Sequence, residues 1–512
     1  MNGPINLRRP VWLSLGLCVA IFAPRAYLAV HDQGVIWADE IFQTLEQGHR
    51  LAFGYGLVPW EFQDGARSWL LPGAIGGFMK LLAKLGFVHG LSLAIGTKLL
   101  FAVGAAITFY PMLRLAHVVA GTVGTLLLGI IAVAFPASLL YSSRALAEVA
   151  CAPLLTWSLW ILWPCRLASR SLACRPEGKT GVARATVWRL LGAGLLFGLA
   201  TVLRCQNGVL LAALVLIVLA RCRLRAAIAL AAGGFAALIF GGLLDWVTWG
   251  KPFQSIIEYV RFNLIEKGSE LWGISPRSFY LHTMLASNGL ALLALVLGFL
   301  AGLARTWPVA VLTLLFLAMH SLFPHKELRF LYPALPLFLT CAAVGLAVLI
   351  NKLPLLRARP ATSAIVVGMV MLAAFGLRAR RVTFDDIGQG SPVPGEIGSP
   401  TTSAWGCLDA QNRLLAEAGR HADLCGLVMP NVNAYWTGGY SYLHRRVPLL
   451  WWPGLDAANY ALLVPGQKLS DTRYKIVTQV SGYALLRRDG PCRPVRGPLG
   501  TFGRLIPVGV VP

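Results

Sequence analysis

Residues 309–350 read VAVLTLLFLAMHSLFPHKELRFLYPALPLFLTCAAVGLAVLI, two apolar runs joined by the charged segment HKELRF at 325–330. An apolar run approaching about 20 residues is long enough to cross a lipid bilayer as a helix. The charged segment therefore lies where one membrane helix ends and the next begins. This stretch predicts a helical membrane protein with ionisable residues grouped at a helix end.

The composition of the whole chain agrees with a membrane protein. Of its 512 residues, 56% are hydrophobic and only 13% are charged, which is too apolar for an ordinary soluble domain. The formal net charge is +23. In membrane proteins such an excess gathers in the cytoplasmic loops, so we interpret it as an orientation signal and predict no nucleic-acid partner.

The apolar runs predict about eleven membrane helices, within a range of roughly ten to thirteen, several of them shorter than the ~20 residues that a span prefers. The runs cover residues 11–30, 91–110, 118–140, 149–163, 187–203, 208–220, 226–246, 283–304, 306–323, 330–350 and 361–377. A further run, 69–88, carries Lys80 and Lys84 on one helical face. We expect it to be an amphipathic helix at the membrane surface.

Basic residues orient these spans. A cytoplasmic N-terminus, with Arg8 and Arg9, places most basic loops in the cytoplasm, as the positive-inside rule requires. These loops include residues 166–189, 221–225 and 352–359, whereas the basic group at 378–381 falls on the wrong side. The first outer loop (31–90), a second large outer loop (247–282) and HKELRF then share the opposite side of the membrane.

The last part of the chain has a different texture. After residue 380 a linker rich in Pro, Gly and Ser is followed by short β-like runs such as YALLVP. We therefore divide the chain into a membrane domain, residues 1–379, and a linker with a small soluble α/β domain, residues 380–512, on the outer side. Cys407 and Cys425 are our first choice for a disulfide, which leaves Cys492 over.

Two adjacent carboxylates, Asp39 and Glu40, follow the first predicted span. Burial and mutual repulsion raise the pKa of a carboxylate, which suits a general base that takes a proton from a sugar hydroxyl. The alternative is that the pair only caps the helix predicted for residues 41–51.

The cations of HKELRF indicate an anion site. On a helix, His325, Lys326 and Arg329 would share one face and present up to three positive charges where a lipid-linked phosphate would lie. Glu327 could orient His325 or Lys326, or bind a sugar. The alternative, that the cations extend to lipid headgroups, explains neither the His nor the Glu.

Several stretches are similar to one known family. HKELRFLYPALP resembles the H-K-E-x-R-F signature of the polyprenyl-phosphate-mannose-dependent mannosyltransferases of GPI-anchor and N-glycan assembly, which have the GT-C fold. Residues 39–72 look like the first luminal loop of that family, and residues 245–280 are similar to its aromatic, Gly-rich middle loop. The resemblance covers most of residues 1–350.

The resemblance implies a mainly α, GT-C-type enzyme that inverts the anomeric centre. It would move a mannosyl residue from a polyprenyl-phosphate donor to a glycan or glycolipid acceptor and form an α-mannoside, without a cofactor or metal. Asp39 would activate the acceptor hydroxyl, with Glu40 beside it. The residues implied at the donor phosphate or sugar are His325, Lys326, Glu327, Arg329, Arg144 and Arg204. The acceptor-side candidates are Glu46, His49, Glu61 and Arg67.

Two other functions stay open at this point. A transferase for another polyprenyl-phosphate sugar would need the same base and phosphate site. A transporter or flippase for a lipid-linked sugar is less expected, because the informative charges lie at the ends of spans rather than within them. The Ala/Gly/Leu/Arg-rich composition favours a bacterial inner-membrane protein whose site faces the periplasm, or the ER lumen if the source is eukaryotic.

Overall fold

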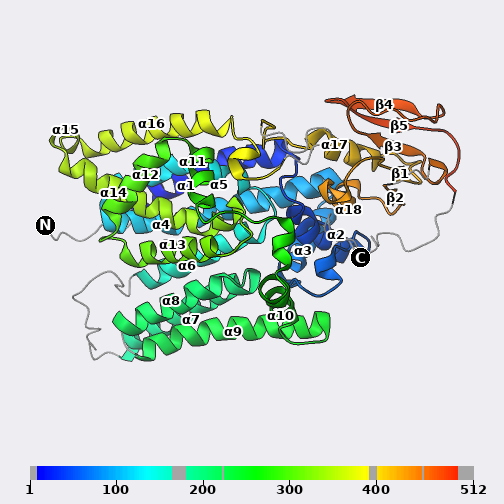
Figure 1. Cartoon of the computed structure of the whole chain (residues 1–512). Helices are drawn as coiled ribbons and strands as arrows, with labels where there is room; N and C mark the ends of the chain where they lie inside the picture. The colour runs from blue at the N-terminus through cyan, green and yellow to red at the C-terminus, as the bar shows by residue number, and fades with distance from the viewer. Residues whose placement is uncertain (1–8, 164–179, 222–223, 391–400, 452–454, 494–512) are drawn as a thin grey trace.

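The computed structural model describes residues 9–163, 180–221, 224–390, 401–451 and 455–493. Figure 1 shows a bundle of long helices with a β-sheet beyond one of its ends. Helices α7 (Thr180–Leu203), α8 (Asn207–Arg221) and α9 (Leu224–Trp249) form one side of the bundle, and α16 (Pro360–Ala379) lies on the opposite side (Figure 1).

The remaining helices build the centre of the bundle and the loops at its end. They are α1 (Arg9–His31), α2 (Glu46–Phe53), α3 (Leu70–Lys84), α4 (Gly90–Ala134), α5 (Pro136–Tyr141), α6 (Ala147–Leu162), α10 (Gln254–Val260), α11 (Phe279–Asn288), α12 (Ala291–Gly302), α13 (Trp307–Leu322), α14 (Leu335–Lys352), α15 (Pro354–Arg357), α17 (Asp409–Ala418) and α18 (Gly439–Leu443). Short 3-10 or π turns are η1 (Ile41–Leu45), η2 (Trp60–Phe62), η4 (Arg261–Ile265), η5 (Gly268–Trp272), η6 (Leu328–Ala334), η7 (Asp385–Ile387), η8 (Ala434–Trp436) and η9 (Leu455–Ala457).

Five helical segments of the described chain are long and apolar enough to cross a membrane, or six if one bent pair counts as a single span. The five are Val11–His31, Gly90–Ala134, Leu224–Trp249, Leu328–Lys352 and Pro360–Ala379. Helices α6, α8 and α13, and the part of α7 from Val187 to Leu203, are apolar but shorter. The predicted count of eleven spans is therefore not confirmed, because several runs give helices below the ~20 residues that a span prefers.

Two glycines interrupt predicted helical runs. The run at 283–304 does not form the single expected helix. It divides at Gly289, where φ is +70°, and the chain direction bends by 120° between α11 and α12. Within α4 the backbone leaves the helical region at Gly121, where φ is +64°. Both positions have a positive φ, which glycine adopts without a Cβ penalty.

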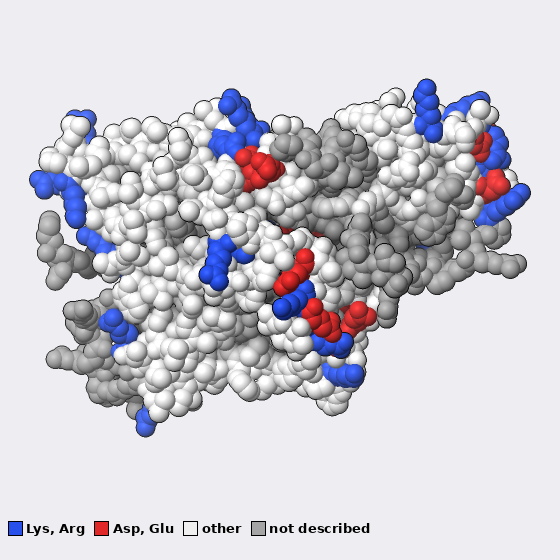
Figure 2. All heavy atoms as spheres, in the orientation of Figure 1, with Lys and Arg blue, Asp and Glu red and all other residues white. Residues whose placement is uncertain are grey.

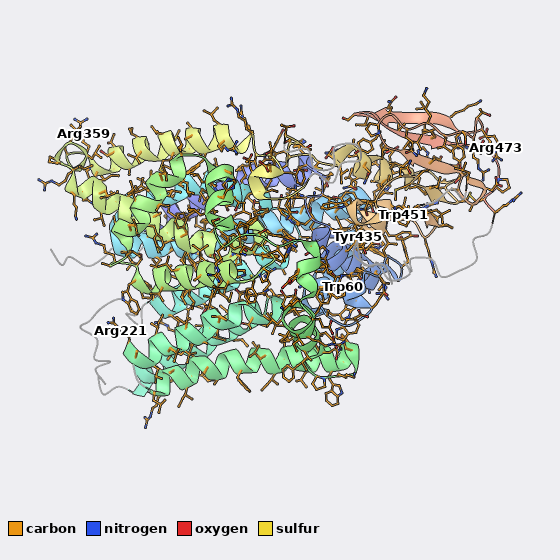
Figure 3. The ribbon with its side chains drawn as sticks, viewed as in Figure 1. Trp60, Arg221, Arg359, Tyr435, Trp451 and Arg473 are labelled. Carbon is orange, nitrogen blue, oxygen red and sulfur yellow. A yellow bond between two sulfur atoms is a disulfide. The ribbon has the colours of Figure 1, made fainter. Side chains whose placement is uncertain are left out.

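The outer surface of the bundle is apolar, as expected of a surface that faces lipid. Large hydrophobic side chains stand exposed along it, for example Leu216, Phe235 and Val247, and Figure 2 shows few charged residues over its broad flank. Arg221 and Arg359 lie at one end of the bundle, and Trp60 and Tyr435 lie toward the other (Figure 3). This separation agrees with basic cytoplasmic loops on one side and polar loops on the opposite side.

The sheet has five strands in the order β2-β1-β3-β5-β4. The strands are β1 (Leu427–Val428), β2 (Leu449–Leu450), β3 (Tyr460–Leu463), β4 (Lys475–Val480) and β5 (Tyr483–Arg487). β1 is parallel to β2 and β3, whereas β5 is antiparallel to β3 and β4. Alternate residues of β3 and β5 face opposite sides of the sheet: Leu462 and Leu485 join the main hydrophobic core, and Ala461 and Leu486 join a small second cluster.

The region after residue 400 is fastened to the loop that follows α1. Val35 N donates to Cys407 O at 2.8 Å, and Gln33 N donates to Asp409 Oδ1 at 2.7 Å. The buried Glu46 carboxylate accepts hydrogen bonds from the backbone of Tyr440 and Ser441. One hydrophobic core runs through the bundle and this region, so the division at residue 380 stays a prediction.

The predicted disulfide is wrong. Cys425 bonds to Cys492, not to Cys407. Cys407 is buried beside Gly34, in the contact between this region and the first outer loop. Cys425 precedes β1 and Cys492 follows β5, and the side-chain oxygen of Asn459, just before β3, accepts a hydrogen bond from Cys425 N at 2.9 Å. The sheet order, which sequence spacing does not reveal, brings the two cysteines together.

Candidate active site

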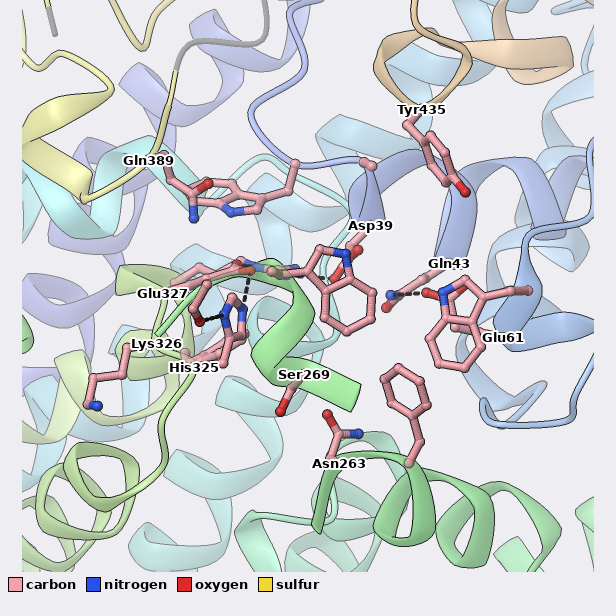
Figure 4. Close-up of a pocket in the computed structure, with 18 of the residues that line it drawn as sticks. Asp39, Gln43, Glu61, Asn263, Ser269, His325, Lys326, Glu327, Gln389 and Tyr435 are labelled. Atoms are coloured by element: carbon pink, nitrogen blue, oxygen red, sulfur yellow. Dashed lines mark hydrogen bonds and ion pairs between the residues drawn. The ribbon is translucent and has the colours of Figure 1, made fainter. Parts of the chain in front are cut away.

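A cavity of about 580 Å³ opens at the end of the bundle nearest the sheet. Its walls come from the first outer loop, the loop around α10, the HKELRF segment and the region after residue 380. In Figure 4, Asp39 lies between His325 and Glu327 on one side and Gln43 and Glu61 on the other. The volume is in the range of ordinary small-ligand sites.

Asp39 lies in the turn before η1, where the first outer loop enters the cavity. Its Oδ2 accepts a hydrogen bond from Arg329 Nη2 at 2.6 Å, and 28% of its side chain is exposed. Oδ1 makes no hydrogen bond within the described residues. The ion pair fixes the carboxylate in place and leaves one oxygen for a ligand.

HKELRF does not form one helix, which corrects the expected shared face: His325, Lys326 and Glu327 are non-helical, and residues 328–330 begin η6. Phe323 has extended backbone angles, and helical geometry resumes only in η6. Pro324 explains the break, because a residue before proline disfavours the helical region. Lys326 Nζ donates to the backbone carbonyls of Phe323, Pro324 and Ser275 at 2.5, 3.4 and 2.8 Å. In Figure 4 the Lys326 ammonium points away from Asp39.

Glu327 joins His325 and Arg329 in one network. Its Oε1 lies 3.0 Å from His325 Nε2, and its Oε2 accepts a hydrogen bond from Arg329 Nε. Burial alone would raise the pKa of Glu327, but the charge of Arg329 and these two hydrogen bonds outweigh it and lower the pKa to about 2. Burial would lower the pKa of His325, but Glu327 and the Gly273 carbonyl outweigh it and raise the pKa. Both ring nitrogens of His325 are thus engaged.

The second residue of the acidic pair, Glu40, lies outside the cavity lining. Glu40 is buried, its Oε1 accepts the backbone N–H of Ile36 at 2.7 Å, and it pairs with Arg144 at 2.9 Å. Arg144 also pairs with Asp32 at 3.2 Å and is likewise absent from the lining. These contacts stabilise the turn that carries Asp39. Glu40 and Arg144 therefore support the cavity wall from outside the lining.

Arg204 does line the cavity, as expected of an outer-face arginine. It follows α7, and its Nη1 pairs with buried Glu148 of α6. Its guanidinium also stands over the Phe330 ring, 4.8 Å from the centroid.

The acceptor-side candidates divide into two groups. Glu61 and Arg67 line the cavity, whereas Glu46 and His49 do not. Burial, followed by the charge of Asp39, raises the pKa of Glu61 to about 7 against the opposing effect of Arg67. His49 Nε2 lies 2.8 Å from His444 Nδ1, and burial lowers the pKa of His49 to about 3. Like Glu46, His49 contacts the region that follows β1.

Several lining residues were not predicted from the sequence. They are Gln43, Trp60, Tyr259, Phe262, Trp272, Gln389, Asn433 and Tyr435. Trp60, Phe262 and Trp272 form an aromatic group, with ring centroids 4.4 Å apart for Trp60 and Phe262 and 5.6 Å apart for Phe262 and Trp272. The aromatic character of the loop at 245–280 was a usable signal for Tyr259, Phe262 and Trp272. No motif marks Gln389, Asn433 or Tyr435. Among the described residues no group of three or more His, Cys, Asp or Glu side chains is placed to hold a metal ion.

Comparison with known proteins gives a family and a fold. The sequence profile of the Alg9-like mannosyltransferase family matches residues 17–387. GPI mannosyltransferase 3 of Yarrowia lipolytica is 27% identical over 351 residues, which are 65% of this chain and 63% of that protein. GPI alpha-1,2-mannosyltransferase 3 of Danio rerio is 25% identical over 351 residues, 65% of this chain and 60% of that protein. This chain therefore spans less than two thirds of the length of these curated relatives.

Among solved structures, ArnT from Cupriavidus metallidurans bound to undecaprenyl phosphate has a TM-score of 0.61. The likeness covers 94% of this chain and 99% of ArnT at 11% identity, so it concerns the fold. The curated relatives are eukaryotic, and the expectation of a bacterial source is accordingly not supported.

Proposed function

The chain belongs to the Alg9-like mannosyltransferase family, and from that premise we propose that it moves a mannosyl residue from a polyprenyl-phosphate donor to a glycolipid acceptor. The family match confirms the resemblance identified from HKELRF and the first outer loop. The reaction would take place in the cavity at the end of the bundle, on the side opposite the basic loops. Because the curated relatives are eukaryotic, we assign that side to the ER lumen.

One observation carries the proposal. The two motifs that suggested the activity meet through the ion pair of Arg329 with Asp39, inside a cavity that also holds further cations. An inverting transfer needs a base near the acceptor hydroxyl and positive charge near the departing phosphate. The cavity supplies both kinds of group from segments far apart in the sequence.

In this proposal Asp39 Oδ1 takes the proton of the acceptor hydroxyl as that oxygen attacks the anomeric carbon of the donor. The bond between the anomeric carbon and the phosphate oxygen breaks, and the polyprenyl phosphate leaves with the bonding electrons. Attack on the face opposite the phosphate turns a β-linked mannosyl phosphate into an α-mannoside. Glu327 acts indirectly by orienting His325 and Arg329, and contact of His325, Lys326 and Arg329 with phosphate stays a prediction.

The test is a transfer assay with the full chain in lipid vesicles. Labelled polyprenyl-phosphate mannose is incubated with the protein and a glycolipid extract, in parallel with labelled polyprenyl-phosphate glucose and arabinose. We expect label from the mannose donor alone to enter the glycolipid fraction, in an α linkage that an α-mannosidase removes. Transfer from another sugar donor, or movement of the intact donor across the vesicle without transfer, would overturn the proposal.

A further inference from the structure

The cations that line the cavity differ in what already neutralises them. Arg329 pairs with Asp39 and Glu327, and Arg204 pairs with Glu148. Lys326 donates to backbone carbonyls, and His325 has both nitrogens engaged. Most of the positive charge predicted for phosphate binding is therefore committed to contacts within the protein.

Arg67 is the exception. Within the described part of the chain its guanidinium makes neither an ion pair nor a side-chain hydrogen bond, and its Nε is buried without a partner. The guanidinium stands 5.2 Å from the centroid of the Tyr259 ring, and Trp249 Nε1 donates to the Arg67 carbonyl at 3.1 Å. Arg67 is thus held in place by its backbone and by a ring, while its donors remain available to a ligand.

Arg204 supplies the second set of donors. Its Nε is also buried without a partner, and its ion pair with Glu148 uses Nη1. A small side pocket of about 40 Å³ meets the main cavity at Arg67, Arg204 and Tyr259. Apolar residues of the span side, Val202 and Leu203, also line this pocket. The guanidinium groups of Arg67 and Arg204 therefore border the junction of the two pockets. This junction is polar on the side of the main cavity and apolar on the side of the helical bundle.

We propose that Arg67, together with Arg204, binds the phosphate of the polyprenyl-phosphate donor, at the junction of the cavity and the side pocket. The inference rests on the proposed function for the identity of the donor, and it moves Arg67 from the acceptor side to the donor side. Guanidinium groups match the geometry of phosphate oxygens and stay charged at any physiological pH. Arg67 is half-buried and its Nε is buried without a partner; a sugar hydroxyl would not neutralise such a cation, whereas a phosphate would.

Glu61 does not neutralise the positive charge of Arg67. It lies close enough for Arg67 to lower its pKa, yet the two side chains form no ion pair within 4.0 Å. The pKa of about 7 means that Glu61 is only partly ionised near neutral pH. The positive charge of Arg67 is thus largely uncompensated until a ligand arrives.

The experiment measures binding of undecaprenyl phosphate, without any sugar, to the purified full chain in detergent, with undecaprenol and inorganic phosphate as separate probes. The variants are Arg67→Gln, Arg67→Lys and, as a matched control, Arg261→Gln, whose side chain is 57% exposed and paired with Glu266. Charge-assisted hydrogen bonds of this kind change binding by about tenfold to a hundredfold. We expect Arg67→Gln to weaken undecaprenyl phosphate binding by that factor, Arg67→Lys to restore part of it, and Arg261→Gln to match the parent chain.

Undecaprenol binding should be the same in all variants. Inorganic phosphate at high concentration should compete with undecaprenyl phosphate for the parent chain and for Arg261→Gln, but not for Arg67→Gln. Parent-like undecaprenyl phosphate binding by Arg67→Gln would overturn the inference. So would a rise in the KM for the acceptor with an unchanged KM for the donor, which the acceptor-side assignment predicts. If the parent chain binds undecaprenyl phosphate through Arg67 but transfers no mannose, the phosphate site stands and the proposed function fails.

Discussion

Arg329 Nη2 lies 2.6 Å from Asp39 Oδ2, although 290 positions separate the two residues in the chain. The contact joins the HKELRF segment to the first outer loop and makes one unit of two motifs. Arg329 also binds Glu327 and stands over the Trp37 ring, 5.4 Å from its centroid. A guanidinium held by this many partners has a fixed direction, so the position of Asp39 in the cavity is fixed with it.

Asp39→Asn tests the base directly. The amide keeps the shape of the carboxylate but cannot accept the hydroxyl proton, and loss of a general base costs about 10²–10⁴-fold in rate. We expect kcat for transfer to fall by that range with little change in thermal unfolding temperature. Asp64→Asn, on an exposed part of the same loop, should keep the parent rate; near-parent turnover of Asp39→Asn would remove Asp39 from this role.

Arg329→Gln should reduce stability as well as activity. The substitution leaves buried Glu327 without its guanidinium partner and leaves buried Glu148 with Arg204 alone. Breaking a buried ion pair from one side costs about 3–5 kcal/mol. We expect a lower unfolding temperature and no measurable transfer. Arg329→Lys should recover part of the stability, and the prediction fails if Arg329→Gln unfolds at the parent temperature.

Glu61 should make stability depend on pH. Its folded-state pKa of about 7 lies above the ordinary value of 4.5, so its contribution is fully present below pH 4.5 and is lost as the pH rises toward 7. Relative to Glu61→Gln, the parent chain should lose on the order of 3 kcal/mol over this window at most. Thermal unfolding at pH 4.5, 6 and 8 measures the difference, and a constant offset between the two proteins would contradict the prediction.

The sequence was most informative where chemistry is local. HKELRF and the Asp39 turn were found because ionisable residues are costly beside a membrane span, and both do line one cavity. The conformation of HKELRF was mispredicted because side-chain spacing was weighed above Pro324, which carried the opposite signal. The acceptor-side prediction for Arg67 stays untested, and our proposal moves Arg67 to the donor side because its role depends on which other cations are already paired. That information exists only in three dimensions.

The wall formed by Gln389 and Tyr435 was beyond sequence reasoning for another reason. Gln389 N donates to Phe384 O, and Phe384 N donates to Thr402 O. Tyr435 enters the cavity because the chain after residue 400 packs on the first outer loop, in part through backbone hydrogen bonds. Backbone contacts leave no pattern of residue types. The pairing of Cys425 with Cys492 depends in the same way on the order of strands in the sheet.

The Cys425–Cys492 bond closes a loop of 67 residues. Such a crosslink stabilises by about 2–4 kcal/mol, chiefly by restricting the unfolded chain. We expect Cys492→Ser to lower the unfolding temperature and to remove the crosslinked peptide found by mass spectrometry of an unreduced digest. Cys18→Ser, in α1, is the control and should keep the crosslink. A peptide linking Cys407 to Cys425 in the parent chain would contradict the pairing.

Gly439 tests whether attachment of the region after residue 400 matters to the cavity. Its φ is +55°, and a Cβ there would lie 2.7 Å from Glu46 Oε2, the oxygen that accepts the Ser441 N–H. Gly406 is the matched control, because its φ is +63° but a Cβ would meet nothing within 4 Å. Gly406→Ala should cost only the backbone strain of about 1 kcal/mol, whereas Gly439→Ala should cost clearly more, since it also displaces a buried carboxylate from its partners. Because Tyr435, which lines the cavity, lies four residues before Gly439, we expect Gly439→Ala to raise the KM for transfer more than Gly406→Ala does. Equal unfolding temperatures for the two alanine variants would show that the Glu46 contact does not hold this region in place.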